Sequence, residues 1–443
     1  MEAYHMSLAR PSKAHLEWAD CEIGVIIHHD LEVYDEAYLH LEPDNLPGPE
    51  VFHPSALDTD QWLSAAASAG AQYAVLVAKH CSGFSLWPTR AHAFSVASSP
   101  WRNGTGDVVA DFIRSCRKFN IRPGLYASCG NNDFFRIRDN KTEPGAAPGH
   151  WERYVQVVKT QLTELFTNYG DLFEIWFDGG SLPYDRGGAE ICELINRHQP
   201  DALVFNGNPQ YQNSIRWIGN EHAIAPDPCF SATDAGTTED GTRLVDAAFL
   251  FAGNRHGRYW CPGEADMPNR DKITGFLGGW FWRRNQDHTL YRPVDLVERY
   301  YSSVGRNCNH LIGMVIDNRG LVPDADVRQF ADYGRLIRRQ YENCRGKIRG
   351  KPGEREFVLD VADAAPVNMF SLMEEISKGE TVCRFQITGF DGEREVPLVD
   401  DKVIGHKRLI RLPEAAYPRY RLKLHEVIDE PHLREFAAYY VAP

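Results

Sequence analysis

Eight short apolar runs recur along the first three quarters of the chain, and polar or small residues end most of them. They cover residues 24–30, 73–80, 122–128, 174–180, 202–207, 215–221, 258–264 and 310–317. Continuous rather than alternating hydrophobicity is typical of strands that are buried on both faces, as in a parallel sheet. The pattern therefore predicts eight strands of one parallel sheet.

Amphipathic stretches lie between several of these runs. Helical spacing of apolar residues is found over 59–69, 107–119, 150–169, 189–198, 243–251 and 324–341. Strands that alternate with helices favour a (β/α)8-type barrel, with some irregularity after residue 221, where only one helix pattern is clear. A doubly wound open sheet is the alternative, but no Gly-x-Gly-x-x-Gly turn follows an early strand.

The pattern changes after the helix expected to end near residue 341. From residue 350, short β-type runs such as EFVLDV and VCRFQITGF are separated by Gly, Pro and acidic clusters. Such spacing is typical of a small all-β unit. We therefore predict two domains, a catalytic barrel over residues 1–345 and a C-terminal β-sandwich over residues 350–443.

Composition and charge narrow the class of protein. The chain has 443 residues, of which 43% are hydrophobic and 12% aromatic, so a large folded core is expected. A net charge of −13 repels phosphate backbones, which disfavours a nucleic-acid partner. No apolar run is long enough to cross a bilayer, so no membrane insertion is expected.

Neither a leader nor a cysteine framework is visible in the sequence. The first twenty residues carry no apolar stretch behind a basic segment. We expect a cytoplasmic protein on this basis, or a periplasmic or secreted one if a leader has been removed. The ten cysteines include no Cys-x-x-Cys pair, which disfavours a disulfide scaffold and a structural zinc site.

Chemically active side chains gather at the predicted strand ends. In a parallel barrel the carboxyl ends of the strands carry the catalytic groups. Acids, imidazoles and indoles at these ends are suited to binding and cleaving a sugar. The candidates are His28, His29, His80, Cys81, Trp87, Tyr126, Trp176, Asp178, Trp217, Glu221, Trp260 and Glu264.

Two of these acids form the strongest candidate pair. Asp178 ends an aromatic strand and is followed by two glycines, whereas Glu221 ends a different strand. Two carboxyl groups that face one cavity are what glycoside cleavage requires. The simpler alternatives are that Asp178 makes an Asx turn with the glycines and that Glu221 is a surface acid.

The histidines support a metal site less well than the two acids support glycoside cleavage. His28 and His29 are adjacent, so on a strand they point to opposite sides and only one can face the barrel mouth. No His-x-His pair occurs at a predicted strand end. We therefore predict no metal ligands at these positions.

Several segments, in the right order, are similar to the retaining α-L-fucosidases of glycoside hydrolase family 29. The first two are GVIIHHD at 24–30 and AKHCSGFSLWPT at 78–89. The next two are the helix and strand over 107–128 and EIWFDGG at 174–180. The segment over 303–323 also resembles the segment that closes the barrel in this family. Together they cover most of residues 20–340.

The resemblance implies roles for individual residues. It makes Asp178 the nucleophile, places His28, His80, Tyr126 and Trp176 in a fucose pocket, and requires no metal or organic cofactor. The stretch over 216–229 resembles the branch that prefers α-1,3- and α-1,4-linked fucose. In that branch the acid/base is the Glu of a Gly-Asn-Glu sequence, which corresponds to Glu221 here. Glu264 is the second candidate for the acid/base. The expected partners are fucosylated oligosaccharides or glycoconjugates.

The sequence also departs from the family's signature. Cys81 and Ser82 replace its second His and its Asp, and His29-Asp30 replaces Trp-Gly after the first-strand His. A thiol donates a hydrogen bond more weakly than an imidazole, so the contact at position 81 is altered. Two other functions are considered: an inactive sugar-binding barrel, and a metal-dependent amidohydrolase using His28, His80 and Asp178.

Overall fold

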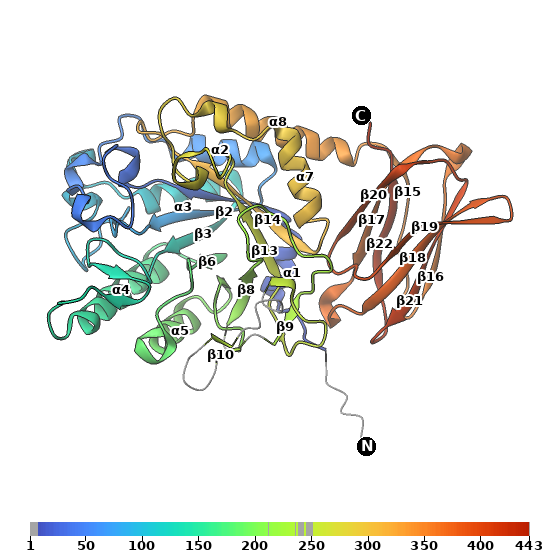
Figure 1. Cartoon of the computed structure of the whole chain (residues 1–443), viewed down its shortest axis with the longest axis horizontal. Helices are drawn as coiled ribbons and strands as arrows, with labels where there is room; N and C mark the ends of the chain where they lie inside the picture. The colour runs from blue at the N-terminus through green and yellow to red at the C-terminus, as the bar shows by residue number, and fades with distance from the viewer. Residues whose placement is uncertain (1–7, 211, 235, 238–242, 245–250, 443) are drawn as a thin grey trace, which may run out of the picture.

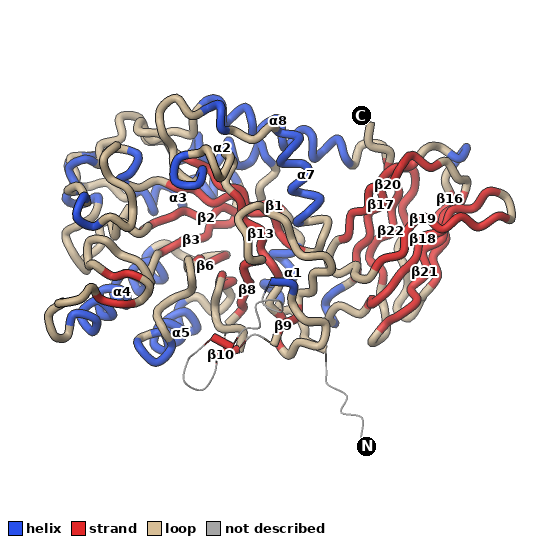
Figure 2. The backbone as a smooth tube through the Cα atoms, in the orientation of Figure 1, coloured by secondary structure: helices blue, strands red, loops and turns tan. Residues whose placement is uncertain are grey.

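The computed structural model describes residues 8–210, 212–234, 236–237, 243–244 and 251–442. A closed barrel of parallel strands surrounded by helices forms the first part of the chain, and two antiparallel sheets form the last part (Figure 1). In Figure 2 the long helices surround the barrel, while strands dominate the C-terminal part. The predicted barrel and β-sandwich are both confirmed.

Eight parallel strands close the barrel. In chain order they are β1 (Ile23–His28), β2 (Tyr73–Lys79), β3 (Arg122–Ala127), β6 (Glu174–Trp176), β7 (Leu203–Phe205), β8 (Asn213–Trp217), β13 (Gly263–Met267) and β14 (Cys308–Val315). The barrel closes where β14 pairs with β1, with Ile23 opposite His310. The residues of β1, β2 and β14 are all buried, which explains their unbroken apolar runs.

Most helices lie where the apolar spacing predicts them. These are α2 (Thr59–Ala69), α3 (Val108–Phe119), α4 (His150–Asn168), α5 (Gly188–His198) and α8 (Asp324–Gln340). Two further helices, α1 (Lys13–Ala19) and α7 (Pro293–Ser303), were not predicted. None of the described helices combines enough length and apolar character to cross a membrane.

The barrel is irregular between β7 and β13. No helix lies between β7 and β8 among the described residues. The helix predicted over 243–251 is wrong at its start, because Arg243–Leu244 form β11 and pair with β10 (Gly236–Thr237). Residues 245–250 of that prediction lie outside the described residues.

The seventh barrel strand lies further along the chain than the sequence predicts. Tyr259–Trp260 form β12, which pairs with β9 (Ala232–Thr233) outside the barrel, and the barrel strand begins only at Gly263. Pro262 separates the two because proline cannot donate a ladder hydrogen bond. The carboxyl end of this strand is therefore Met267, so Asp266 rather than Glu264 lies near the barrel mouth.

Helix α1 packs against the amino-terminal ends of the barrel strands. The ring of His15 makes a 3.0 Å hydrogen bond with the carbonyl oxygen of Ser214, in β8. Asn309, near the start of β14, donates to the carbonyl oxygen of Trp18 at 2.7 Å. Burial lowers the pKa of His15 to about 4, so its ring is neutral near pH 7. The end of the barrel opposite the mouth is thus covered.

Two four-stranded sheets face each other in the C-terminal part. The first orders its strands as β15 (Cys344–Ile348), β22 (Leu433–Tyr439), β17 (Val367–Glu374) and β20 (Arg408–Ala415). The second orders them as β16 (Glu356–Asp360), β21 (Arg419–Val427), β18 (Val382–Asp391) and β19 (Arg394–Asp401). Alternate residues of β21, such as Tyr420 and Leu422, enter the core between the sheets, as expected for strands with one solvated face.

Polar contacts join the sandwich to the barrel. Lys407 pairs with Glu22 at 2.7 Å, and Tyr300 donates to the same carboxylate at 2.5 Å. Asn307 donates to Glu380 and accepts from the backbone N–H of His406. Glu22 and Asn307 precede β1 and β14, so these contacts lie at the amino-terminal ends of the barrel strands.

Candidate active site

A cavity of about 450 Å³ opens at the carboxyl ends of the barrel strands. Its acidic and imidazole side chains are those of His28, His40, His80, Asp178, Glu221 and Asp266, and its aromatic walls come from Tyr126, Trp176, Phe205, Trp217, Trp280 and Phe281. This is the position at which barrel enzymes bind their substrates. Concave apolar walls with a few convergent polar groups are typical of a small-molecule site.

The cavity brings together most of the residues predicted from the sequence. Those that line it are His28, His80, Cys81, Tyr126, Trp176, Asp178, Trp217 and Glu221. Four others do not line it, namely His29, Trp87, Trp260 and Glu264. Each of the four has other partners in the structure.

His29 and Trp87 face away from the cavity. Because successive side chains of a strand alternate, His29 points outward, where its Nε2 atom lies 2.7 Å from the hydroxyl of Tyr34 and its ring packs on Phe52. The indole of Trp87 is buried and donates to Glu164 of α4 at 2.9 Å. Their prediction as substrate contacts is therefore corrected.

Trp260 and Glu264 were predicted at the barrel mouth because the seventh strand was expected over 258–264, whereas β13 spans Gly263–Met267. Trp260 packs with Ala19 and with Ile376 of the sandwich, on the far side of the barrel from the mouth. Glu264 is fully buried inside the barrel and accepts hydrogen bonds from Tyr73 at 2.6 Å and from Trp176 at 3.0 Å. It does not line the cavity, so its reserve role as acid/base is corrected.

Asp178 lies just beyond the end of β6 and is open to solvent through the cavity. Gly179 and Gly180 follow with φ values of +66° and +93°, which side chains rarely adopt, so glycine allows this sharp exit from the strand. The hydroxyl of Tyr126 donates to Oδ2 of Asp178 at 3.4 Å. Burial raises the pKa of Asp178 and the charge of Glu221 raises it further, while the Tyr126 hydrogen bond opposes the rise.

Glu221 is half-buried on the loop that follows β8. Its Oε2 atom lies 2.5 Å from the ammonium of Lys272 and accepts a hydrogen bond from the indole of Trp280 at 3.3 Å. Its charge contributes to the raised pKa of both Asp178 and Asp266. Glu221 is therefore an ion-paired carboxylate that interacts electrostatically with two other acids of the cavity.

Asp266 is a cavity acid that was not predicted. It is buried, and Trp217 donates to its Oδ1 atom at 2.8 Å. Burial raises the pKa of Asp266 well above its usual range, and the charge of Glu221 adds to the shift. The run GEADM, which follows Pro262, was the signal that could have identified it.

Stacked rings form one wall of the cavity. The ring of Trp176 lies 5.2 Å from that of Tyr126 and 3.9 Å from that of Phe205, nearly parallel to both. On another side, the ring of Trp280 lies 5.0 Å from that of His28. Burial lowers the pKa of His28 to about 3, so a neutral imidazole faces the cavity at pH 7. Neutral rings and apolar faces suit a sugar with a deoxy carbon.

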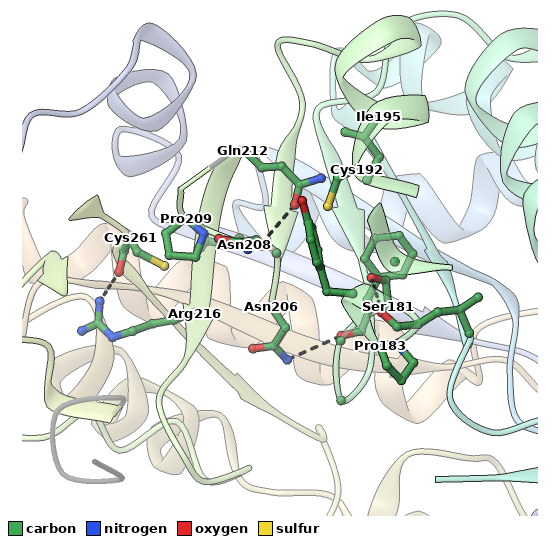
Figure 3. A pocket seen from close by; sticks show the side chains of 18 of the residues that line it. Ser181, Pro183, Cys192, Ile195, Asn206, Asn208, Pro209, Gln212, Arg216 and Cys261 are labelled. Carbon is green, nitrogen blue, oxygen red and sulfur yellow. Dashed lines mark hydrogen bonds between the residues drawn. The ribbon is translucent and has the colours of Figure 1, made fainter. Parts of the chain in front are cut away.

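A second cavity of about 290 Å³ adjoins the first (Figure 3). Both are lined by Gly179 and Asn206, so they meet where the chain leaves β6. Asn206 donates to the carbonyl oxygen of Phe177 at 3.5 Å, as drawn in Figure 3. Residues from α5, such as Cys192, line its outer side, next to the stretch where the described residues form no helix between β7 and β8.

The residues that could bind a metal do not cluster in the way that the amidohydrolase alternative requires. His28, His80 and Asp178 all line the cavity but do not form a cluster of ligand atoms in the described part of the chain. The set that does is Glu32, His40 and His80. Glu32 and His40 lie on the loop after β1 and were not predicted from the sequence.

Comparisons with known proteins agree with this geometry. A family model described as alpha-L-fucosidase matches residues 16–342. Alpha-L-fucosidase 1 of Arabidopsis thaliana is 27% identical, over 98% of this chain and 87% of its own. A crystal structure from Bacteroides thetaiotaomicron superposes with a TM-score of 0.89 at 30% identity, covering 98% of this chain and 100% of that one. A glycoside hydrolase 29 family member from an unidentified rumen bacterium gives 0.83 at 26%, covering 99% and 78%.

Proposed function

This chain belongs to the alpha-L-fucosidase family, and from that premise we propose that it removes terminal α-linked fucose from glycans by a retaining double displacement. Asp178 is the nucleophile and Glu221 the acid/base. The observation that carries the proposal is that these two acids, from separate strand ends, line one cavity and interact electrostatically. Two carboxyl groups that flank the scissile bond are the machinery of retaining glycosidases.

In the first step a carboxylate oxygen of Asp178 attacks the anomeric carbon of fucose. The bond from that carbon to the glycosidic oxygen breaks through an oxocarbenium-like transition state, and Glu221 gives its proton to the departing oxygen. A glycosyl ester on Asp178 results. Glu221 must carry a proton for this step, which requires that its ion pair with Lys272 be broken.

In the second step water attacks the same anomeric carbon, and Glu221 now accepts the proton of that water. The ester bond breaks, Asp178 leaves as a carboxylate, and the sugar is released with its original anomeric configuration. Tyr126 stays neutral, since burial raises its pKa well above the usual range, and it donates to Asp178 at 3.4 Å. Its hydrogen bond holds the nucleophile in place.

Asp266 is a second candidate for the acid. Burial raises its pKa well above the usual range, which favours the protonated form that an acid catalyst needs, and it lines the same cavity as Asp178. Glu221 is preferred because it is less buried and sits in the Gly-Asn-Glu sequence that the resemblance identifies.

For the substrate, we infer a preference for α-1,3- and α-1,4-linked fucose on branched glycans. The support is the likeness of residues 216–229 to that branch of the family. A panel of α-1,2-, α-1,3-, α-1,4- and α-1,6-fucosylated oligosaccharides, with the product anomer followed by NMR, tests linkage and stereochemistry together. Release of β-fucose first would contradict the retaining mechanism, and fastest cleavage of α-1,2 linkages would contradict the branch.

The two other functions make different predictions. An inactive sugar-binding barrel would bind aryl α-L-fucoside without releasing nitrophenol. A metal-dependent amidohydrolase would lose its activity to a chelator, whereas the double displacement proceeds without a metal. The proposal therefore expects nitrophenol release that survives chelation.

A further inference from the structure

The loop after β1 brings a buried carboxylate against two histidines at the edge of the cavity. One ligand atom each from Glu32, His40 and His80 lie within 4.8 Å of one another. Glu32 is fully buried in a short 3-10 turn, Leu31–Val33, whereas His40 is partly exposed and lines the cavity with His80. We propose that Glu32, His40 and His80 form a site for a divalent transition-metal ion such as Zn²⁺, and that the bound ion blocks the sugar cavity.

The ligand set matches the chemistry of zinc. Two histidines and one carboxylate, with a fourth position left open, form one of the common zinc sites. Zinc bonds of 2.0–2.2 Å in a tetrahedron place ligand atoms roughly 3.3 Å apart. Oε1 of Glu32 and Nδ1 of His40 are already 3.1 Å apart. All three ligand atoms lie within 4.8 Å of one another, so the widest separation need contract by no more than roughly 1.5 Å when a metal binds.

Glu32 and His80 each have one buried polar atom that needs an interaction. Within the described part of the chain, neither Oε2 of Glu32 nor Nδ1 of His80 has a hydrogen-bond partner. A buried polar atom without a partner is costly, and most such atoms in folded proteins have one. A metal ion would supply the missing interaction for both side chains.

The surrounding charge favours a cation. Two further buried acids, Asp30 and Asp133, lie near Glu32. In the described residues the ion pair recorded for Glu32 is with His40, and none with lysine or arginine is found. A divalent cation bound here would be attracted by this group of buried acids.

The location determines the effect of the ion. His40 and His80 line the cavity that also holds Asp178, and the ring of His80 lies 5.8 Å from that of Tyr126, nearly parallel to it. A metal held by His40 and His80 would therefore lie at the wall of the cavity in which the sugar is proposed to bind. Zn²⁺ should therefore compete with the fucoside, raising KM without changing kcat.

Metal binding can be measured without any activity. The protein is stripped with a chelator and titrated with Zn²⁺ by calorimetry, and with Co²⁺ by visible absorption, since cobalt in a tetrahedral site gives intense d–d bands. We expect one equivalent to bind. Glu32→Gln and His40→Gln should each weaken binding by at least about 10-fold, the range found when metal-site partners are removed. Matched thermal unfolding confirms that each variant is folded.

Two controls make the result decisive. His425 is an exposed histidine of the sandwich, so His425→Ala should bind the metal as the parent protein does. Asp178→Ala should also keep the site. Absence of cobalt bands in the parent, or unchanged affinity in Glu32→Gln and His40→Gln, would overturn the proposal, as would loss of the site in Asp178→Ala. Competition between Zn²⁺ and the fucoside rests on the proposed fucosidase activity, whereas metal binding is measured without any activity. Failure of the proposed function can therefore be distinguished from failure of the metal site.

Discussion

Two pairs of acids meet in this barrel, and they differ in what can reach them. Asp178 and Glu221 line the open cavity at the mouth. Glu174 and Glu264 meet inside the barrel, where both are fully buried. In both pairs the charge of one acid raises the pKa of the other. Neighbouring carboxyl groups therefore do not by themselves indicate a catalytic pair, and of the two pairs the proposed catalytic one is the pair that lines a cavity.

The buried pair supports the wall of the cavity. Burial raises the pKa of Glu264 to about 7 and that of Glu174 well above its usual range. Glu264 accepts hydrogen bonds from Tyr73 and from Trp176, which lines the cavity. Gly24 makes room for Tyr73, because a Cβ atom there would lie 2.3 Å from its ring. One pair is thus suited to chemistry and the other to holding Trp176.

The largest difference between the pairs should appear in Asp178→Ala. Loss of the nucleophile should lower kcat on the order of 10⁴-fold, because no other group can form the glycosyl ester. Added azide or formate should restore part of the rate by attacking in its place. Steady-state rates with aryl α-L-fucoside measure both effects, and an unchanged kcat would reject Asp178 as the nucleophile.

Removal of the acid should show a leaving-group dependence. Glu221→Ala should lower kcat for natural glycans by about 10²–10⁴-fold, the usual contribution of general acid catalysis. Nitrophenyl fucosides need no protonation, so their first step should be nearly unaffected. Asp266→Asn serves as the matched comparison, and if it alone shows this pattern, the acid/base is Asp266.

For the buried pair we expect an effect on stability rather than on rate. Glu264 has a pKa of about 7 in the folded protein against 4.5 in the unfolded chain, so the folded state holds more protons between these values. Its contribution to the free energy of unfolding is therefore present below pH 4.5 and is lost as the pH rises to about 7.

Glu264→Gln should make that pH dependence shallower by up to about 1.4 kcal/mol per pH unit, while kcat stays within about tenfold of the parent value. Urea unfolding at several pH values between 4.5 and 7, beside rate assays, checks both outcomes. A loss of kcat as large as that of Asp178→Ala would show that the inner pair takes part in the chemistry.

The smallest effect is a shift in a pH profile. Asp178 must be ionised to attack, so activity falls as the pH drops below its pKa, which the charge of Glu221 helps to raise. Glu221→Gln removes that charge and should move the acid limb of kcat/KM for nitrophenyl fucoside to lower pH, by up to about one unit. A shift to higher pH would contradict the electrostatic link between the two acids.

Continuous apolar runs made the barrel predictable, because strands buried on both faces have no polar alternation. Asp178 could be predicted for the same reason, since it is the polar residue that ends such a run. The seventh strand could not be placed from hydrophobicity alone, since Tyr259 and Trp260 are as apolar as a barrel strand but pair elsewhere. Because of this error, Glu264 was predicted as a cavity residue in place of Asp266, which lines the cavity.

Residues on long loops were beyond prediction. His40 and Trp280 reach the cavity from loops whose paths depend on tertiary packing, and no local pattern marks them as site residues. Trp87 shows the converse, because a tryptophan close to a signature histidine turns outward to bond Glu164. Residue type indicates what a side chain can do, whereas the fold decides which side chains meet.

The central claim is that Asp178 forms a covalent bond with the sugar. A fluorinated fucosyl fluoride, which slows the second step, should trap the glycosyl-enzyme, and mass spectrometry of its peptides should find one added sugar on Asp178. No label on Asp178→Ala is the matching expectation. A label on another carboxylate of the parent protein, or turnover that inverts the anomeric configuration without any label, would contradict the account.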